Sequence, residues 1–211
     1  MIEIIESAFL TSAPTIRLAP ENEFQNEIAF MARSNTGKSS LLNTLTQRKS
    51  LAKVSSTPGK TRLINYFDVI FMDRESGEKN RAILVDLPGF GYAKVAKSLK
   101  SDWESNLTNF ISERKQIRVF VHLIDCRHPD LEIDASVAQY LNEICTEDQH
   151  ILQVYTKIDK LNQKELSVLK NRFPNALMIS NSKRKGVDKI VSVLYAMLKG
   201  GSEGGSEGGS E

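Results

Sequence analysis

The sequence predicts an α/β fold in which a mostly parallel sheet is covered by helices on both faces. Two observations carry this prediction. Short apolar runs alternate with amphipathic stretches along most of the 211 residues, and a glycine-containing loop follows one of the first apolar runs. The composition, 40% hydrophobic and 26% charged, is that of a globular protein large enough for one sizeable core. In such a sheet, ligands bind beyond the carboxyl ends of the strands.

The expected elements follow one another in regular order along the chain. Strands are expected at 27–31, 63–72, 81–87, 117–125, 150–156 and 176–180. Helices are expected from about Lys38, near 98–114, over 131–145, over 162–172, and from Val187 to Leu198, where apolar residues recur at helical spacing. The polar tract RESGEKN, which contains Gly77, predicts an antiparallel hairpin between the strands at 63–72 and 81–87, at one edge of the sheet.

Residues 1–199 are expected to form one domain, and residues 200–211 a disordered linker or tag, because they repeat GGSE three times and offer nothing to bury. Without the three glutamates of this tail, 28 basic residues face 23 acidic ones, so the folded part carries about +5 instead of the formal +2. This mild basic bias fits an RNA-rich partner, and it fits a basic solvated surface as well.

Several function classes are not expected from this chain. Its N-terminus lacks a basic start, and no segment reaches about 18 apolar residues, so neither secretion nor a membrane span is predicted. Cys126 and Cys145 lack metal-type spacing and are expected to be reduced, buried apolar residues. His122, His128 and His150 are expected to be structural or on the surface, and none is assigned a role.

The stretch ARSNTGKSS, which follows the strand at 27–31, has the layout of a phosphate-binding loop. Gly37 would let the backbone approach the phosphates, Lys38 would supply positive charge, and the Ser39 hydroxyl would ligate magnesium. The alternative is a serine-rich turn that caps an ordinary helix. Ala32 stands where the usual pattern has glycine, and its Cβ would cost about 1–2 kcal/mol if the backbone there required a positive φ.

Two further motifs end strands that should point to the same side. In DLPG, a sequence also common in ordinary turns, Asp86 would hold magnesium through water and Gly89 would approach the γ-phosphate. In TKID, Asp159 would accept hydrogen bonds from N1 and the 2-amino group of guanine, a donor pair that adenine lacks. Lys157 would lay its aliphatic stem along the base. The alternative for Asp159 is an ordinary acidic residue at a helix N-terminus.

Five stretches resemble, in order, the motifs of the EngB (YihA/YsxC) family of bacterial GTP-binding proteins: ARSNTGKSSLLN, SSTPGKTRLINYF, DLPGFGYAKV, TKIDKL and SNSKRKGVDKI. The resemblance covers about residues 1–198. It implies a Ras-like GTPase of the bacterial cytoplasm, with roles in large ribosomal subunit assembly and in normal cell division and septation. It also implies that Thr61 is the switch threonine that ligates magnesium and senses the γ-phosphate. Three positions depart from the family pattern, namely Ala32 for Gly, Thr36 for Val and Asn181 for Ser.

The expected GTP site combines five segments, the last of which contacts the guanine through its backbone by resemblance. They are Ala32, Arg33, Ser34, Asn35, Thr36, Gly37, Lys38 and Ser39; Gly59, Lys60, Thr61, Arg62 and Leu63; Asp86, Leu87, Pro88 and Gly89; Thr156, Lys157, Ile158 and Asp159; and Ile179, Ser180, Asn181 and Ser182. Lys38, Thr61 and Asn35 are expected to act in catalysis. Ser39, Thr61 and, through water, Asp86 are expected to hold Mg²⁺.

The expected activity is a magnesium-dependent GTPase with a slow intrinsic rate, because Phe90 follows DLPG where Ras-like enzymes place a water-orienting glutamine. Asn35 stands where potassium-activated relatives of this GTPase class have an asparagine, so K⁺ is a second expected cation. An asparagine that merely tolerates a left-handed turn explains the same residue. A non-catalytic, GTP-gated module that binds RNA or protein is the alternative function. An ATP-using P-loop kinase is disfavoured by TKID.

The expected partners are GTP and GDP, and the large ribosomal subunit or its precursor, including rRNA and proteins; neither membrane nor DNA is expected. The expected ribosome contact is a nucleotide-dependent basic surface over residues 53–66 and 92–100. It would comprise Lys53, Lys60, Arg62, Lys94, Lys97 and Lys100.

Overall fold

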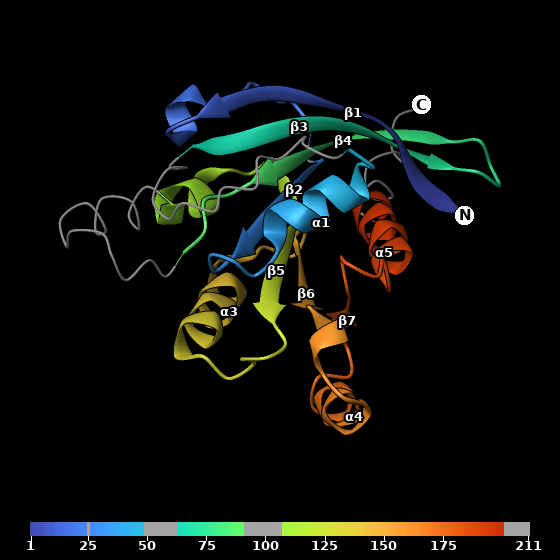
Figure 1. The fold of residues 1–211 in the computed structure, drawn as a ribbon. Helices are drawn as coiled ribbons and strands as arrows, with labels where there is room; N and C mark the ends of the chain where they lie inside the picture. Colours follow the sequence, from blue (N-terminus) through green and yellow to red (C-terminus); the bar gives the residue numbers. More distant parts are fainter. Residues whose placement is uncertain (25, 49–62, 91–106, 201–211) are drawn as a thin grey trace, which may run out of the picture.

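The computed structural model describes residues 1–24, 26–48, 63–90 and 107–200, which form a seven-stranded sheet with helices on both faces (Figure 1). The strands are β1 (Ile2–Ala13), β2 (Glu27–Ala32), β3 (Ile64–Asp73), β4 (Lys79–Asp86), β5 (Ile117–Asp125), β6 (His150–Thr156) and β7 (Leu177–Met178). The helices are α1 (Lys38–Leu45), α3 (Glu132–Ile144), α4 (Gln163–Arg172) and α5 (Val187–Lys199), with short 3-10 turns η1 (Ile16–Leu18) and η2 (Ile158–Lys160). Residues 107–113 are also helical, whereas the rest of the helix expected near 98–114 lies mostly outside the described residues.

The predicted mostly parallel sheet is confirmed. The strand order is β1-β3-β4-β2-β5-β6-β7. β2 pairs in parallel with β4 and β5, and β6 pairs in parallel with β5 and β7. Every residue of β2 is buried, as a strand in the middle of a sheet with two covered faces requires. The carboxyl ends of these five strands therefore lie along one edge of the sheet.

The antiparallel part of the sheet is one strand wider than the predicted hairpin. β3 and β4 form that hairpin, and its turn contains Gly77 at φ +72°. β1, which was not predicted, pairs antiparallel with β3 and forms the edge. The pattern of β1 is irregular because the register shifts twice, between Ile4 and Glu6 and between Phe9 and Thr11. Each shift changes which side chains face the core, and bulges of this kind are common at sheet edges.

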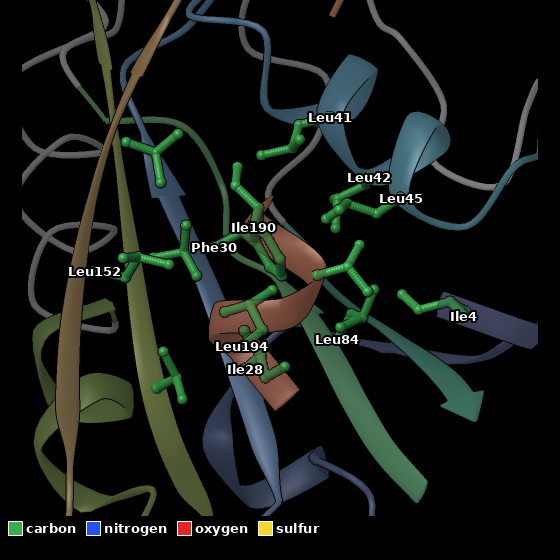
Figure 2. Packing of buried hydrophobic residues seen from close by; sticks show 14 of the residues in the cluster. Ile4, Ile28, Phe30, Leu41, Leu42, Leu45, Leu84, Leu152, Ile190 and Leu194 are labelled. Carbon is green, nitrogen blue, oxygen red and sulfur yellow. The ribbon is translucent and has the colours of Figure 1, made fainter. Parts of the chain in front are cut away.

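Each face of the sheet packs against its own helices. On one face, α1 and α5 cover alternate strand residues, and Figure 2 shows Ile28 and Phe30 of β2 among Leu42 and Ile190 from these helices. On the other face, α3 and the 107–113 segment cover the intervening residues of β2, including Met31. Successive residues of a strand point to opposite faces, so the even-numbered side chains Ile28 and Phe30 pack on one face of β2 and the odd-numbered Met31 packs on the other.

Within the described ranges, no helix combines the length and the apolar character that a membrane crossing requires.

Candidate functional site

The loop between β2 and α1 has the backbone of a phosphate-binding loop. Asn35 (φ +64°) and Gly37 (φ +106°) are left-handed, and Thr36 between them is not. When residues with positive and negative φ alternate along the backbone, their successive N–H groups can converge on an anion. Gly37 is also the N-cap of α1, where unpaired N–H groups and the helix dipole favour negative charge.

Ala32 fits this loop without left-handed strain. It is the last residue of β2, is fully buried, and is not among the described residues with a positive φ. An extended backbone is open to alanine, so the added Cβ carries no conformational cost. Its carbonyl oxygen accepts a hydrogen bond from the Phe90 N–H at 3.1 Å, which ties the end of β2 to the segment after β4.

Lys38 and Asp86 meet in a largely buried ion pair. Lys38 Nζ donates a hydrogen bond to Asp86 Oδ1, and the side chains are only 12% and 9% exposed. The other carboxylate oxygen of Asp86 accepts from Asn65 Nδ2 at 3.4 Å. Asn65 is not among the predicted site residues. The signal that points to it is the hairpin register, because Asn65 lies directly opposite Asp86.

The side chains around Lys38 suit a magnesium ion. Ser39 is the second residue of α1, and the ion pair holds the Asp86 carboxylate beside the first. A hydroxyl and a carboxylate are hard oxygen ligands of the kind that Mg²⁺ prefers, with waters and phosphate oxygens completing its shell. In the part of the chain that the structure describes, three or more His, Cys, Asp or Glu side chains nowhere gather as a metal cage. Thr61, the third expected ligand, lies outside the described residues.

The end of β6 is fastened to the phosphate loop by two side chains. Thr156 Oγ1 donates to Thr36 O at 2.7 Å, and Lys157 Nζ donates to Asn35 O at 2.5 Å. Lys157 Nζ also donates to Asp125 Oδ2 at 2.8 Å. Burial raises the pKa of Asp125, but hydrogen bonds from Arg127 and Lys157 outweigh it and hold this pKa below its ordinary value. Asp125, which ends β5 as Asp86 ends β4, was also not predicted.

The Asp159 carboxylate is ready to accept hydrogen bonds. Ser180 Oγ donates to Asp159 Oδ1 at 2.6 Å, and Ser182 Oγ lies 3.1 Å from Ser180 Oγ. The hydrogen bond from Ser180 lowers the pKa of Asp159 below its ordinary value. The carboxylate is therefore ionised near neutral pH, which is the form that accepts hydrogen bonds from two donors of a base.

The segment after β7 forms a tight loop. Ser180 and Lys185 exchange backbone hydrogen bonds, both of 3.0 Å. Asn181 Nδ2 donates to Gly37 O at 3.2 Å, so this loop touches the phosphate loop. Gly186 closes the turn at φ +78°, and an ideal Cβ placed on it would lie 2.6 Å from the Met178 carbonyl oxygen.

We expect Gly186→Ala to destabilise the fold and to weaken nucleotide binding, because the methyl group collides with backbone that supports the Ser180–Ser182 segment. Gly77→Ala is the matched control, since Gly77 has a similar φ of +72° and no atom within 4 Å of its ideal Cβ. Both variants incur the left-handed cost of about 1–2 kcal/mol, and only Gly186→Ala adds the collision. Urea unfolding and GDP titration measure both effects. Equal losses of stability and unchanged GDP affinity would contradict this expectation.

The described residues bring four of the five predicted segments together around the phosphate loop. Gly89 packs against it so closely that an ideal Cβ would lie 2.9 Å from Ser34 Oγ. Leu87, Ile158 and Ile179 are buried in the apolar clusters, which leaves their backbone for any nucleotide contact. Leu63 is described and exposed. Outside the described residues lie Gly59, Lys60, Thr61, Arg62, Lys53, Lys94, Lys97, Lys100 and the tail after Gly200.

Phe90 is a core residue rather than a substitute for glutamine. Its side chain is buried in the cluster on the α3 face, and its ring centroid lies 6.1 Å from that of His122. A buried aromatic ring offers no acceptor that could orient an attacking water.

Comparisons with known proteins place these features in a family. Residues 27–157 match a family model described as 50S ribosome-binding GTPase. The chain is 51% identical over 197 residues to a protein of Aliarcobacter butzleri named "Probable GTP-binding protein EngB", covering 91% of this chain and 98% of the relative. The crystal structure of "a probable GTP-binding protein engB" matches with a TM-score of 0.61 at 22% identity, over 82% of this chain and 99% of that one. Era in complex with MgGDPNP and nucleotides 1506–1542 of 16S ribosomal RNA matches with a TM-score of 0.59, also at 22% identity, over 88% of this chain and 58% of Era.

Proposed function

The chain belongs to the EngB family of GTP-binding proteins, within the 50S ribosome-binding GTPases, and on this premise we propose that it is a slow, magnesium-dependent GTPase switch. It would act in the bacterial cytoplasm in assembly of the large ribosomal subunit, and so support normal cell division and septation. The observation that carries the proposal is the meeting of Asp86, Lys157 and Asn181, from separate elements, at the loop that ends in Lys38.

Each part of the loop has a role in this proposal. The loop amides and Lys38 hold the phosphates, and Ser39 and Asp86, with Thr61, hold Mg²⁺. When bound, the ion offsets the charge that develops on the β- and γ-phosphates. Asp159 selects guanine, and the backbone of Ser180 to Ser182 supports the base. Slow hydrolysis is proposed because Phe90 lies in the core and supplies no group that positions water.

The ribosomal partner is supported by charge as well as by family. Lys183, Arg184 and Lys185 are three consecutive exposed cations, and they directly follow the segment proposed to hold the base. Era, which has the same fold, binds ribosomal RNA in its solved complex. A cationic loop that is closed by backbone hydrogen bonds between Ser180 and Lys185 suits contact with RNA phosphates, and such contacts weaken steeply as salt rises.

Two measurements test the proposed switch. Co-sedimentation with large subunits should be stronger with a non-hydrolysable GTP analogue than with GDP, and should fall as salt rises. Single-turnover GTP hydrolysis with and without ribosomes then separates a GTPase from a GTP-gated binding module, since the module would not hydrolyse faster on the ribosome. Equal sedimentation in both nucleotide states, without salt dependence, would remove the ribosomal switch.

We expect GTP hydrolysis to be faster in K⁺ than in Na⁺ at equal ionic strength, with Asn35 responsible for the difference. A cation beside the phosphates would offset transition-state charge, as an arginine finger does. Because Asn35 is left-handed, alanine would strain the loop, so Asn35→Gly is the sharper variant: it accepts this φ and removes only the amide. Potassium should accelerate the unmutated protein and not Asn35→Gly. Equal rates in both salts for the unmutated protein would show that Asn35 serves the turn alone.

A further inference from the structure

Three ionisable side chains from separate elements lie together behind the phosphate loop. Arg33, the first residue after β2, donates from Nε to Asp134 Oδ2 at 2.8 Å. Asp134 stands in the first turn of α3 and is 2% exposed. Its other oxygen, Oδ1, lies 3.6 Å from Nε2 of His122 on β5, which is fully buried.

Burying these three ionisable side chains in the core is unfavourable in free energy compared with burying apolar ones. Burial of a carboxylate and an imidazole is unfavourable unless hydrogen bonds compensate for the lost water. Among the described residues, Asp134 Oδ1, Arg33 Nη2 and both ring nitrogens of His122 have no hydrogen-bond partner. Apolar side chains would pack at lower cost on this face, where Met31, Phe120 and Leu141 form the surrounding cluster. Stability alone therefore does not account for the polar residues here.

The cluster joins the phosphate loop to the segment after Asp86. The His122 ring packs against the Phe90 ring at 6.1 Å between centroids. Phe90 in turn forms a parallel backbone bridge with Arg33 and donates its N–H to Ala32 O. Arg33, Asp134, His122 and Phe90 thus form a closed circuit of four contacts, three of them between side chains and the fourth, between Phe90 and Arg33, through backbone.

We propose that Asp134 and His122 are positioning residues for the phosphate site. Asp134 acts through Arg33, which opens the loop that leads to Gly37 and Lys38. His122 acts through Phe90, which follows Gly89, the residue packed on Ser34. Neither residue contacts the nucleotide itself. The inference rests on the proposed function, because it takes the phosphate loop to hold the phosphates shared by GDP and GTP and Gly89 to lie on the γ-phosphate side.

The two residues should therefore produce different signatures in nucleotide binding. Asp134→Ala is expected to weaken GDP and a GTP analogue alike, on the order of tenfold, because a misplaced loop affects every phosphate. Arg33→Ala should do the same, and the double variant should be no weaker than Arg33→Ala, because both changes remove one contact. His122→Leu fills the same core position with an apolar side chain and removes the ring that contacts Phe90, so it should weaken the GTP analogue severalfold more than GDP.

A matched control separates positioning from stability. Glu27 and Arg114 form a second buried pair, with Arg114 Nη2 donating to Glu27 Oε1 at 2.6 Å, at the opposite end of β2 from Arg33. Glu27→Gln should lower the unfolding temperature and leave GDP affinity unchanged. Asp134→Asn, which keeps the side-chain volume, is measured alongside Asp134→Ala in case the smaller residue fails to fold.

Titration of a fluorescent GDP and GTP analogue against each variant, with thermal unfolding of the same samples, tests the inference. Losses of affinity that add in the double variant, or Asp134 variants that bind as the unmutated protein does, would overturn it. A fall in GDP affinity for Glu27→Gln that matches its fall in stability would also overturn the inference. In that case any destabilising change near β2 would be enough to weaken nucleotide binding. Failure of the unmutated protein to bind either nucleotide would instead overturn the proposed function.

Discussion

Asp159→Asn is expected to lose affinity for GTP on the order of 10³-fold and to gain affinity for xanthosine triphosphate. The Asp159 carboxylate accepts a hydrogen bond from Ser180 Oγ at 2.6 Å, and this hydrogen bond lowers the pKa of Asp159 further below neutral pH. An amide offers one acceptor and one donor, so it leaves a guanine donor unpaired. Xanthine has a carbonyl at C2, which accepts from the new amide instead.

Dissociation constants for GTP and xanthosine triphosphate, measured on both proteins, check this prediction. Asp188→Asn is the matched control, because Asp188 is an exposed acid in the first turn of α5, just after the loop that holds Ser180. The control should bind GTP as the unmutated protein does. Unchanged GTP affinity in Asp159→Asn would show that Asp159 does not select guanine, and an ATP-using P-loop enzyme would again be a candidate.

Lys38→Ala is expected to abolish measurable hydrolysis and to weaken both GDP and GTP, since it removes the positive charge held at the phosphate loop. It should also destabilise the protein by about 3 kcal/mol, because Asp86 is left as a buried carboxylate whose remaining partner among the described residues is Asn65. Asp86→Asn in the Lys38→Ala background should recover part of this stability, since a neutral amide needs no counter-ion.

Nucleotide titration and urea unfolding of the single and double variants measure the two effects separately. Lys160→Ala is the control, because it removes a lysine that lies outside the phosphate loop. The Lys160 side chain is exposed, and its Nζ lies 3.8 Å from Asp159 Oδ2. Lys160→Ala should change neither nucleotide affinity nor the free energy of unfolding appreciably. Retention of full nucleotide affinity in Lys38→Ala would contradict the role of Lys38, whatever happens to stability.

The motifs on the carboxyl ends of strands were predictable because each one combines local features. An apolar strand, a turn and a polar side chain of fixed type stand together within a few residues at Lys38, Asp86 and Asp159. The fold class followed from the same alternation of strands and helices, and the sheet confirms it. Local sequence sufficed here because a parallel sheet gathers its strand ends at one edge.

Contacts between distant segments were not predictable in this way. Arg33 and Asp134 are 101 residues apart, and only the packing of α3 on the sheet brings them together. Asn65 and Asp125 likewise acquire their roles from strand register and from the reach of Lys157. His122 looks like an interior strand residue in the sequence, because nothing near it in the chain indicates which side chain will face it.

The position of β1 at the sheet edge has a consequence for how the chain is made. Ile2 pairs with Asp73, and Ala13 pairs with Ile64, so β1 finds its partner strand only after more than fifty further residues have been added. At the usual pace of translation this delay lasts several seconds. During that time the backbone N–H and C=O groups of the nascent β1 have no strand partner, so this segment is exposed to pairing with a neighbouring chain. Closure of this long loop is a non-local step, so docking of β1 is expected to be among the slow events of folding.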